Sequence, residues 1–135
     1  AAERAGWLFI DLPDGCKQIG ASRLIRVKTP FDCIMVRGSQ SMFIDAKTTQ
    51  LPRFGLSIFK DKDRHQVDTL RRIQDHGHKA GFIVWFRAED LIVFFSAQQI
   101  ADKNYSGSLK PEDGVLLGGI SHVDLQHAFR TVEKP

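Results

Sequence analysis

Cysteine is scarce in this chain, and its scarcity limits the kinds of site that the protein can build. Among 135 residues only Cys16 and Cys33 are cysteines, and they do not form a CxxC pair. A single disulfide would be unusual in a cytosolic protein, and the spacing does not suit a zinc site. We therefore expect a cytoplasmic protein with two reduced thiols, of which Cys33 belongs to the core.

Long apolar runs are missing as well. No run approaches the roughly 18 residues that a membrane-spanning helix needs. The sequence also lacks a charged segment followed by an apolar stretch and a small-residue cleavage site, so we expect no secretion signal and no membrane partner. Repeats and low-complexity tracts are absent, while 42% of the residues are hydrophobic. These features predict one globular domain over residues 1–135.

Apolar and turn patterns predict an α/β domain with a central mixed sheet. A helix is expected over 63–76, with Asp63 as N-cap and Gly77 as the stop. Weaker helical patterns cover 1–5 and 123–129. The predicted strands cover 7–12, 23–27, 31–36, 42–48, 81–86 and 91–95. A loop over 50–62 should pack four apolar side chains against the domain: Leu51, Phe54, Leu56 and Ile58.

The predicted hairpin of 31–36 and 42–48 brings two acidic residues together. A turn centred on Gly38-Ser39 places Asp32 directly opposite Asp45, with their Cβ atoms about 5 Å apart. Because side chains alternate along a strand, Lys47 shares the face of Asp45. Facing carboxylates repel, and a divalent cation such as Mg²⁺ would offset the repulsion. Lys47 could hold an attacking water or stabilise charge on a phosphate. Ordinary exposed charges on a half-solvated sheet are the alternative.

One part of the sequence resembles the signature of PD-(D/E)XK nucleases. It consists of Pro30-Phe31-Asp32, twelve further residues and then Asp45-Ala46-Lys47. Over 31–86, a little under half the chain, the layout is similar to RecU-type Holliday junction resolvases. There, Phe43-Ile44-Asp45-Ala46-Lys47-Thr48-Thr49 is followed by His65-Gln66, a helix and the strand 81–86.

The resemblance implies a restriction-endonuclease-like fold and a Mg²⁺ site in which Mn²⁺ substitutes. Asp32 and Asp45 would be the metal ligands, joined by the Ala46 carbonyl and by Glu3 as a further acid. The implied catalytic group consists of both aspartates, Lys47 as the catalytic lysine and Thr48 at the border of the site. Gln66 would contact the scissile phosphate or support the residues around the metal, with an ordinary polar first turn of the helix as the alternative.

Two features depart from the resolvase pattern. Resolvases usually carry Glu where this chain has Asp45, although the wider superfamily allows Asp. RecU-type enzymes also have a long insertion ahead of the first acid, which enters the junction, and here 20–29 alone fills that space. A compact archaeal or phage type of resolvase is therefore an equal alternative.

The net charge of +3 and the pI near 9.0 are compatible with a polyanionic partner. Basic residues cluster in sequence around the acidic pair and are expected to contact phosphates, with a merely solvated basic face as the alternative: Arg23, Arg26, Lys28, Arg37, Arg53, Lys60, Lys62, Arg64, Arg71 and Arg72. The sequence thus predicts a homodimeric endonuclease that resolves four-way DNA junctions. A superfamily nuclease acting on duplex or flap DNA, and a non-catalytic DNA-binding module, are the alternatives.

Overall fold

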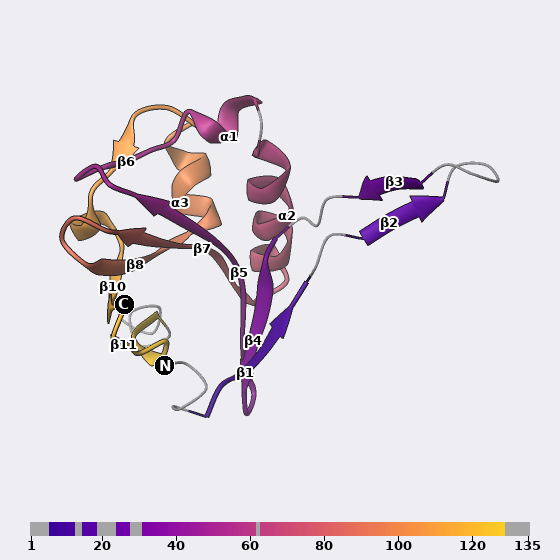
Figure 1. The fold of residues 1–135 in the computed structure, drawn as a ribbon, viewed down its shortest axis with the longest axis horizontal. Helices are drawn as coiled ribbons and strands as arrows, with labels where there is room; N and C mark the ends of the chain where they lie inside the picture. Colours follow the sequence, from indigo (N-terminus) through magenta and orange to yellow (C-terminus); the bar gives the residue numbers. More distant parts are fainter. Residues whose placement is uncertain (1–5, 13–14, 19–23, 28–30, 62, 129–135) are drawn as a thin grey trace.

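A computed structural model of the chain describes residues 6–12, 15–18, 24–27, 31–61 and 63–128. It is an α/β structure built on a mixed sheet of seven strands (Figure 1). The strands follow the spatial order β1 (Leu8–Asp11), β4 (Cys33–Arg37), β5 (Gln40–Thr49), β7 (Lys79–Phe86), β8 (Leu91–Ser96), β10 (Val115–Gly119) and β11 (His122–Val123). The central β5–β7 pair is parallel and the other pairs are antiparallel.

Three helices lie on one face of this sheet. They are α1 (Ile58–Asp61), α2 (Arg64–Asp75) and α3 (Ala97–Asp102), and a 3-10 turn follows at Pro111–Asp113. Val67 and Leu70 of α2 join Phe82 and Phe95 of the sheet in one core cluster. A second cluster on the opposite face contains Cys33, Ile44 and Phe94 together with Trp7, Leu125 and Ala128. No helix in the described ranges is long and apolar enough to cross a membrane.

The predicted hairpin has the expected register. Its pairs run from Cys33 opposite Ile44 to Arg37 opposite Gln40, and Gly38 takes a positive φ of 59° in the turn. Asp32 precedes β4 by one residue, and its N–H donates to the Ile44 carbonyl at 3.1 Å. The printed register ends at Cys33, so Asp32 lies just past the paired residues, beside Ile44 and Ala46, and the exact opposition to Asp45 that the sequence predicts is not part of the ladder.

Other sequence predictions have mixed outcomes. The long helix and the strands near 7–12, 23–27, 81–86 and 91–95 are confirmed within a residue or two. In the loop, Phe54 and Leu56 are buried as expected, but the prediction was wrong for Leu51 and Ile58, which are 67% and 40% exposed. The helix expected over 123–129 is found only at 126–128, because Val123 belongs to β11 and residues 124–125 are not helical, while the pattern over 1–5 lies outside the described residues.

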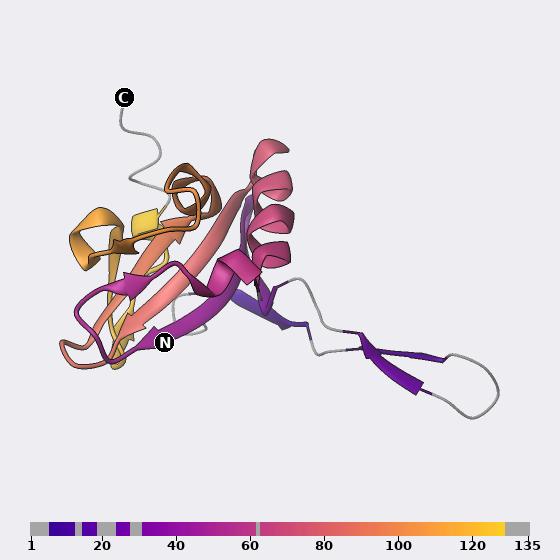
Figure 2. The same ribbon diagram turned by 90° about the horizontal axis from the view of Figure 1, so that it is seen from above.

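Two further pairs of strands complete the fold, β6 (Phe54–Gly55) with β9 (Ser108–Leu109) and β2 (Gly15–Gln18) with β3 (Leu24–Val27). Both views show the β2–β3 pair projecting from the body as an arm, between β1 and β4 along the chain (Figures 1 and 2). The arm already begins at Gly15, ahead of the segment 20–29 that the sequence analysis considers.

Candidate functional site

Asp45 lies in the middle of β5 and is only 1% exposed. Its side chain shares the sheet face that α2 covers. The Lys47 ammonium lies 3.0 Å from Asp45 Oδ2, and the Gln66 amide Nε2 donates to Oδ1 at 3.3 Å. Burial raises the pKa of Asp45 to about 6, the nearby Asp32 carboxylate adds to the rise, and Lys47 opposes it. The fold thus holds a carboxylate that one ammonium does not fully compensate.

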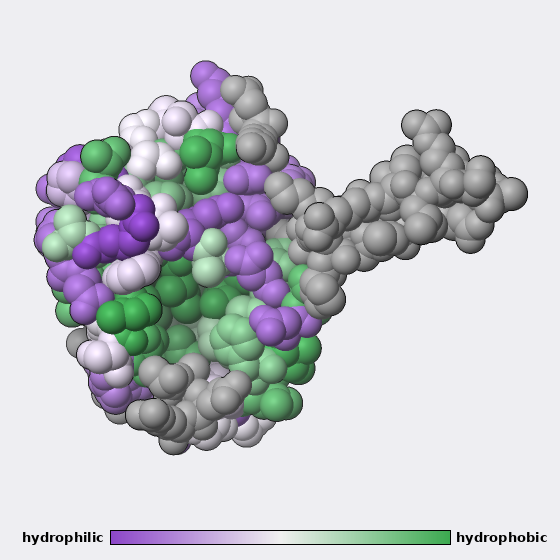
Figure 3. Space-filling model, viewed as in Figure 1, coloured by the Kyte–Doolittle hydropathy of each residue, from purple (hydrophilic) through white to green (hydrophobic). Residues whose placement is uncertain are grey.

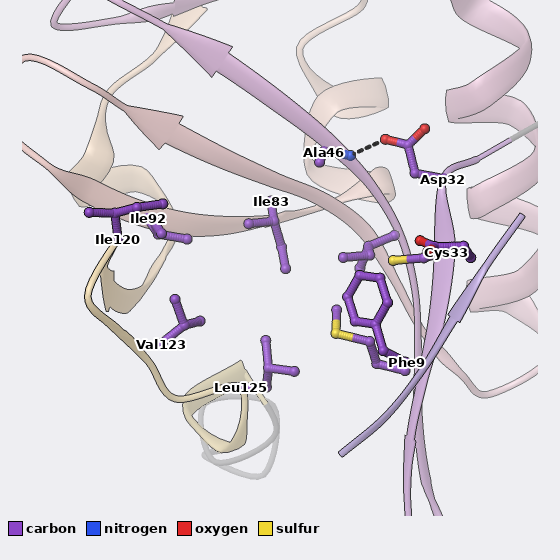
Figure 4. A pocket seen from close by; sticks show the side chains of 12 residues that line it. Phe9, Asp32, Cys33, Ala46, Ile83, Ile92, Ile120, Val123 and Leu125 are labelled. Atoms are coloured by element: carbon purple, nitrogen blue, oxygen red, sulfur yellow. Dashed lines mark hydrogen bonds between the residues drawn. The ribbon is translucent and has the colours of Figure 1, made fainter. Parts of the chain in front are cut away.

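Asp32 is exposed at the end of β4 and is held by the backbone of β5. Its Oδ2 accepts a hydrogen bond from the Ala46 N–H at 2.8 Å (Figure 4). The N–H and C=O of one residue in a strand point toward the same neighbouring strand. The Ala46 carbonyl is therefore on the Asp32 side of β5, and Asp32 also interacts electrostatically with Asp45.

Lys47 connects β5 to the start of α2. Its ammonium lies 3.3 Å from Asp63 Oδ2 in addition to its contact with Asp45, and 5.8 Å from the centre of the Phe59 ring. The lysine side chain is 17% exposed, so its charged end lies close to the surface. Asp63 occupies the N-cap position of α2, but its side chain makes no capping hydrogen bond. Asp63 is therefore the N-cap residue of α2 by position, as predicted, and its carboxylate contacts Lys47 instead of capping the helix.

Gln66 completes the described group from the first turn of α2. It is 5% exposed, and while its Nε2 donates to Asp45, its buried Oε1 has no hydrogen-bond partner in the part of the chain that the structure describes. A buried oxygen without a partner costs about 1–3 kcal/mol. An oxygen of this kind on a side chain that contacts the Asp45 carboxylate suits a cation or a cation-bound water, and in this respect the residues present fit Mg²⁺.

The remaining predicted site residues are placed differently. Thr48 points to the opposite face of β5 from Asp45 and Lys47, and its hydroxyl donates to the Trp85 carbonyl at 3.4 Å. Glu3 lies outside the described residues. Within those residues no group of three or more His, Cys, Asp or Glu side chains is arranged to hold a metal ion. Two carboxylates with carbonyl oxygens and waters would be an ordinary ligand set for Mg²⁺, which keeps several of its waters.

The predicted phosphate-contacting residues do not all gather around the acidic pair. Arg37 is at the turn of the hairpin, five residues and about 17 Å along the strand from Asp32. Arg53 donates to Ser108, and Arg71 Nε donates to the Gln98 side chain at 3.3 Å.

Two basic residues are adjacent to Asp63. Lys60 is exposed on α1, and Arg64 is exposed at the start of α2, with its guanidinium 4.6 Å from the centre of the Tyr105 ring. Arg72 is exposed further along α2, and Arg26 belongs to β3 of the arm. The other three lie outside the described residues: Arg23, Lys28 and Lys62. Lys60 and Arg64 therefore lie close along the chain to Asp63, the second carboxylate that contacts Lys47.

An apolar cavity of about 480 Å³ opens on the sheet face away from α2 (Figures 3 and 4). Ile83, Ile92 and Leu125 are among its lining residues, and Asp32 and Ala46 form part of its rim. Cys33 also lines it, and burial raises the pKa of this thiol to about 12, helped by the charges of Asp32 and Asp11. Cys33 is thus the reduced core cysteine that the sequence predicts, and its thiol stays protonated at neutral pH.

No family model matches the sequence, and no curated protein matches it.

Proposed function

We propose that this protein is a Mg²⁺-dependent endodeoxyribonuclease with a restriction-endonuclease-like PD-(D/E)XK fold, and that it resolves four-way DNA junctions. The observation that carries the proposal is the position of the Lys47 ammonium, 3.0 Å from the buried Asp45 carboxylate, at the point where Asp32 faces β5. An acidic pair with an ammonium at its side is a chemical combination suited to phosphodiester hydrolysis.

Four oxygens would hold the metal ion. Asp32 and Asp45 contribute carboxylates, Ala46 contributes its carbonyl, and Gln66 contributes the Oε1 that lacks a partner among the described residues. A bound Mg²⁺ would lower the pKa of a coordinated water and withdraw charge from a phosphate oxygen, and Mn²⁺ would substitute for it.

The chain's own residues would then act on the substrate. Lys47 reaches the surface beside Asp45, where its ammonium can stabilise the negative charge that grows on the phosphate in the transition state. The Ala46 N–H fixes the Asp32 carboxylate, and the Gln66 amide fixes that of Asp45, so that neither ligand has to be ordered when DNA binds. This preorganisation supports a catalytic role for the group more than a vestigial one.

The choice of a four-way junction is supported by the arm. The β2–β3 pair projects beyond the body immediately ahead of Asp32 in the chain, which is where RecU-type resolvases carry the segment that enters the junction (Figure 2). Lys60 and Arg64, exposed near the start of α2, would contact phosphates.

The test is cleavage of a labelled four-way junction with and without Mg²⁺, compared with cleavage of its component duplexes. Asp32→Asn and Asp45→Asn are expected to reduce cleavage to background while junction binding in Ca²⁺ persists, because phosphate contacts supply most of the affinity. The matched control is Asp75→Asn, an exposed carboxylate at the far end of α2. Wild-type cleavage rates in Asp45→Asn would refute the two-carboxylate site, and equal cleavage of duplex and junction would refute the choice of substrate.

A further inference from the structure

Lys47 has two carboxylate partners, and only one of them is a proposed metal ligand. Asp45 Oδ2 lies 3.0 Å from the ammonium and Asp63 Oδ2 lies 3.3 Å from it. Asp63 comes from the start of α2, a different element from β5, so the fold brings the second carboxylate to the lysine across the packing of helix on sheet. Asp63 is 9% exposed and forgoes the capping hydrogen bond that its N-cap position offers.

The shared lysine creates a competition at Asp45. An ammonium 3.0 Å from Asp45 Oδ2 opposes a divalent cation at the same carboxylate, both by occupying an oxygen and by like-charge repulsion. A lysine with no other anionic partner would stay on Asp45 and weaken the binding of the cation. In its observed conformation the Lys47 ammonium already contacts Asp63 and lies next to the Phe59 ring. Asp63 can therefore hold the ammonium when it moves away from Asp45.

We propose that Asp63 is a positioning residue that keeps the Lys47 ammonium beside the site while a divalent cation occupies Asp45. The inference rests on the proposed function, because it takes Asp32 and Asp45 as the metal ligands. With Asp63 in place, cation binding shifts the ammonium toward Asp63 without releasing it to solvent. The lysine then remains next to the phosphate and no longer neutralises the carboxylate that the cation needs.

The test measures Mn²⁺ binding to the full chain by titration calorimetry, without DNA. Asp63→Asn is expected to weaken Mn²⁺ binding about 3- to 10-fold, because Lys47 then pairs with Asp45 alone. Asn is as good an N-cap residue as Asp, so the helix should be retained. Lys47→Met is expected to tighten Mn²⁺ binding, and adding Asp63→Asn to Lys47→Met should change the affinity by less than 2-fold.

Testing Asp63→Asn in the Lys47→Met variant distinguishes positioning of the Lys47 ammonium from a direct attraction between the Asp63 charge and the cation. If Asp63 only attracted the cation through space, Asp63→Asn would weaken Mn²⁺ binding equally with and without Lys47, and that result would overturn the inference. Asp68→Asn, an exposed carboxylate one turn further along α2, controls for the loss of a negative charge on the helix. Unchanged Mn²⁺ affinity in Asp63→Asn, when Asp45→Asn abolishes binding, would also overturn it. No Mn²⁺ binding in the wild-type chain would refute the proposed function itself, and the role of Asp63 with it.

Cleavage supplies an independent readout. In single-turnover reactions at saturating Mg²⁺, Asp63→Asn is expected to lower the rate at least 10-fold with little change in DNA affinity, and Asp63→Glu is expected to restore much of it. Equal losses in both variants would indicate a structural role at the start of α2 and would overturn the positioning role.

Discussion

Asp45 is a carboxylate that the fold buries at a cost, and the cost depends on pH. Its pKa is raised from the usual 3.8 to about 6 by burial and by Asp32. Below about pH 4 the carboxyl is protonated in both folded and unfolded chains and burial costs no ionisation energy. As pH rises from about 4 to 6 the unfolded chain loses this proton first, so the free energy of unfolding falls by about 3 kcal/mol.

Asp45→Asn should therefore be more stable than the wild type at pH 8 in EDTA, by up to about 3 kcal/mol, and should match it near pH 4. Urea unfolding at the two pH values measures the difference, with Asp75→Asn as the control. Mg²⁺ at pH 8 should raise the stability of the wild type and not that of the variant. The same advantage for Asp45→Asn at both pH values would contradict the ionisation argument.

At the residue scale, the sequence predicts what depends on local geometry. The register of β4 against β5, which brings Asp32 near Asp45, follows from a single turn, because the register of a hairpin is set by its loop. The contact of the Asp63 carboxylate with Lys47 was not predicted, because an aspartate ahead of an apolar helix looks the same in the sequence whether or not its side chain caps the helix. Its contact with Lys47 depends on how α2 packs against β5, which no local pattern specifies. Gln66 came from the family resemblance and not from its own pattern.

At the scale of elements, the long periodic segments were predictable and the short ones were not. The sequence predicts α2 and the central strands, whereas α3 has six residues and β10 carries a bulge near Gly118. Such elements are specified by tertiary packing more than by periodicity. The same holds for the loop before α2. Its apolar residues have no regular spacing, so the sequence does not indicate that the Leu51 side chain points outward.

The start of α2 also tests the route of DNA across the protein. Arg64→Ala should weaken binding to all DNA sequences alike. It should also make the plot of log affinity against log salt less steep by about 1, the change expected for one lost phosphate contact. The structure supplies a comparison, because Arg37 lies at the opposite end of the hairpin from Asp32. Binding titrations at several salt concentrations measure both variants. A flatter slope for Arg37→Ala and an unchanged one for Arg64→Ala would place the DNA path over the hairpin turn.

At the scale of the whole molecule, the proposed reaction needs more than one chain. A four-way junction has two equivalent strands to cut, and this chain carries one acidic pair. Two cuts within the lifetime of one complex require two sites, most simply in a C₂ homodimer. The described surface offers two apolar regions that could form the interface. One is the edge strand β1, with Leu8 61% and Phe9 41% exposed, and the other lies around β10, with Leu116 51% and Ile120 60% exposed.

Light scattering at micromolar concentration is expected to give the mass of a dimer, and a cruciform plasmid should be linearised without accumulation of the nicked form. Leu8→Glu and Ile120→Glu place a charge in each apolar region in turn, and the one that forms the interface should give monomers, because a buried unpaired carboxylate is costly. Both side chains are exposed, so neither substitution should unfold the chain. The monomeric variant should still nick the junction, since its acidic pair is intact, but should convert little of the plasmid to the linear form. A wild-type chain that is monomeric and only nicks would leave a nuclease of another kind, one that cuts a single strand at each encounter.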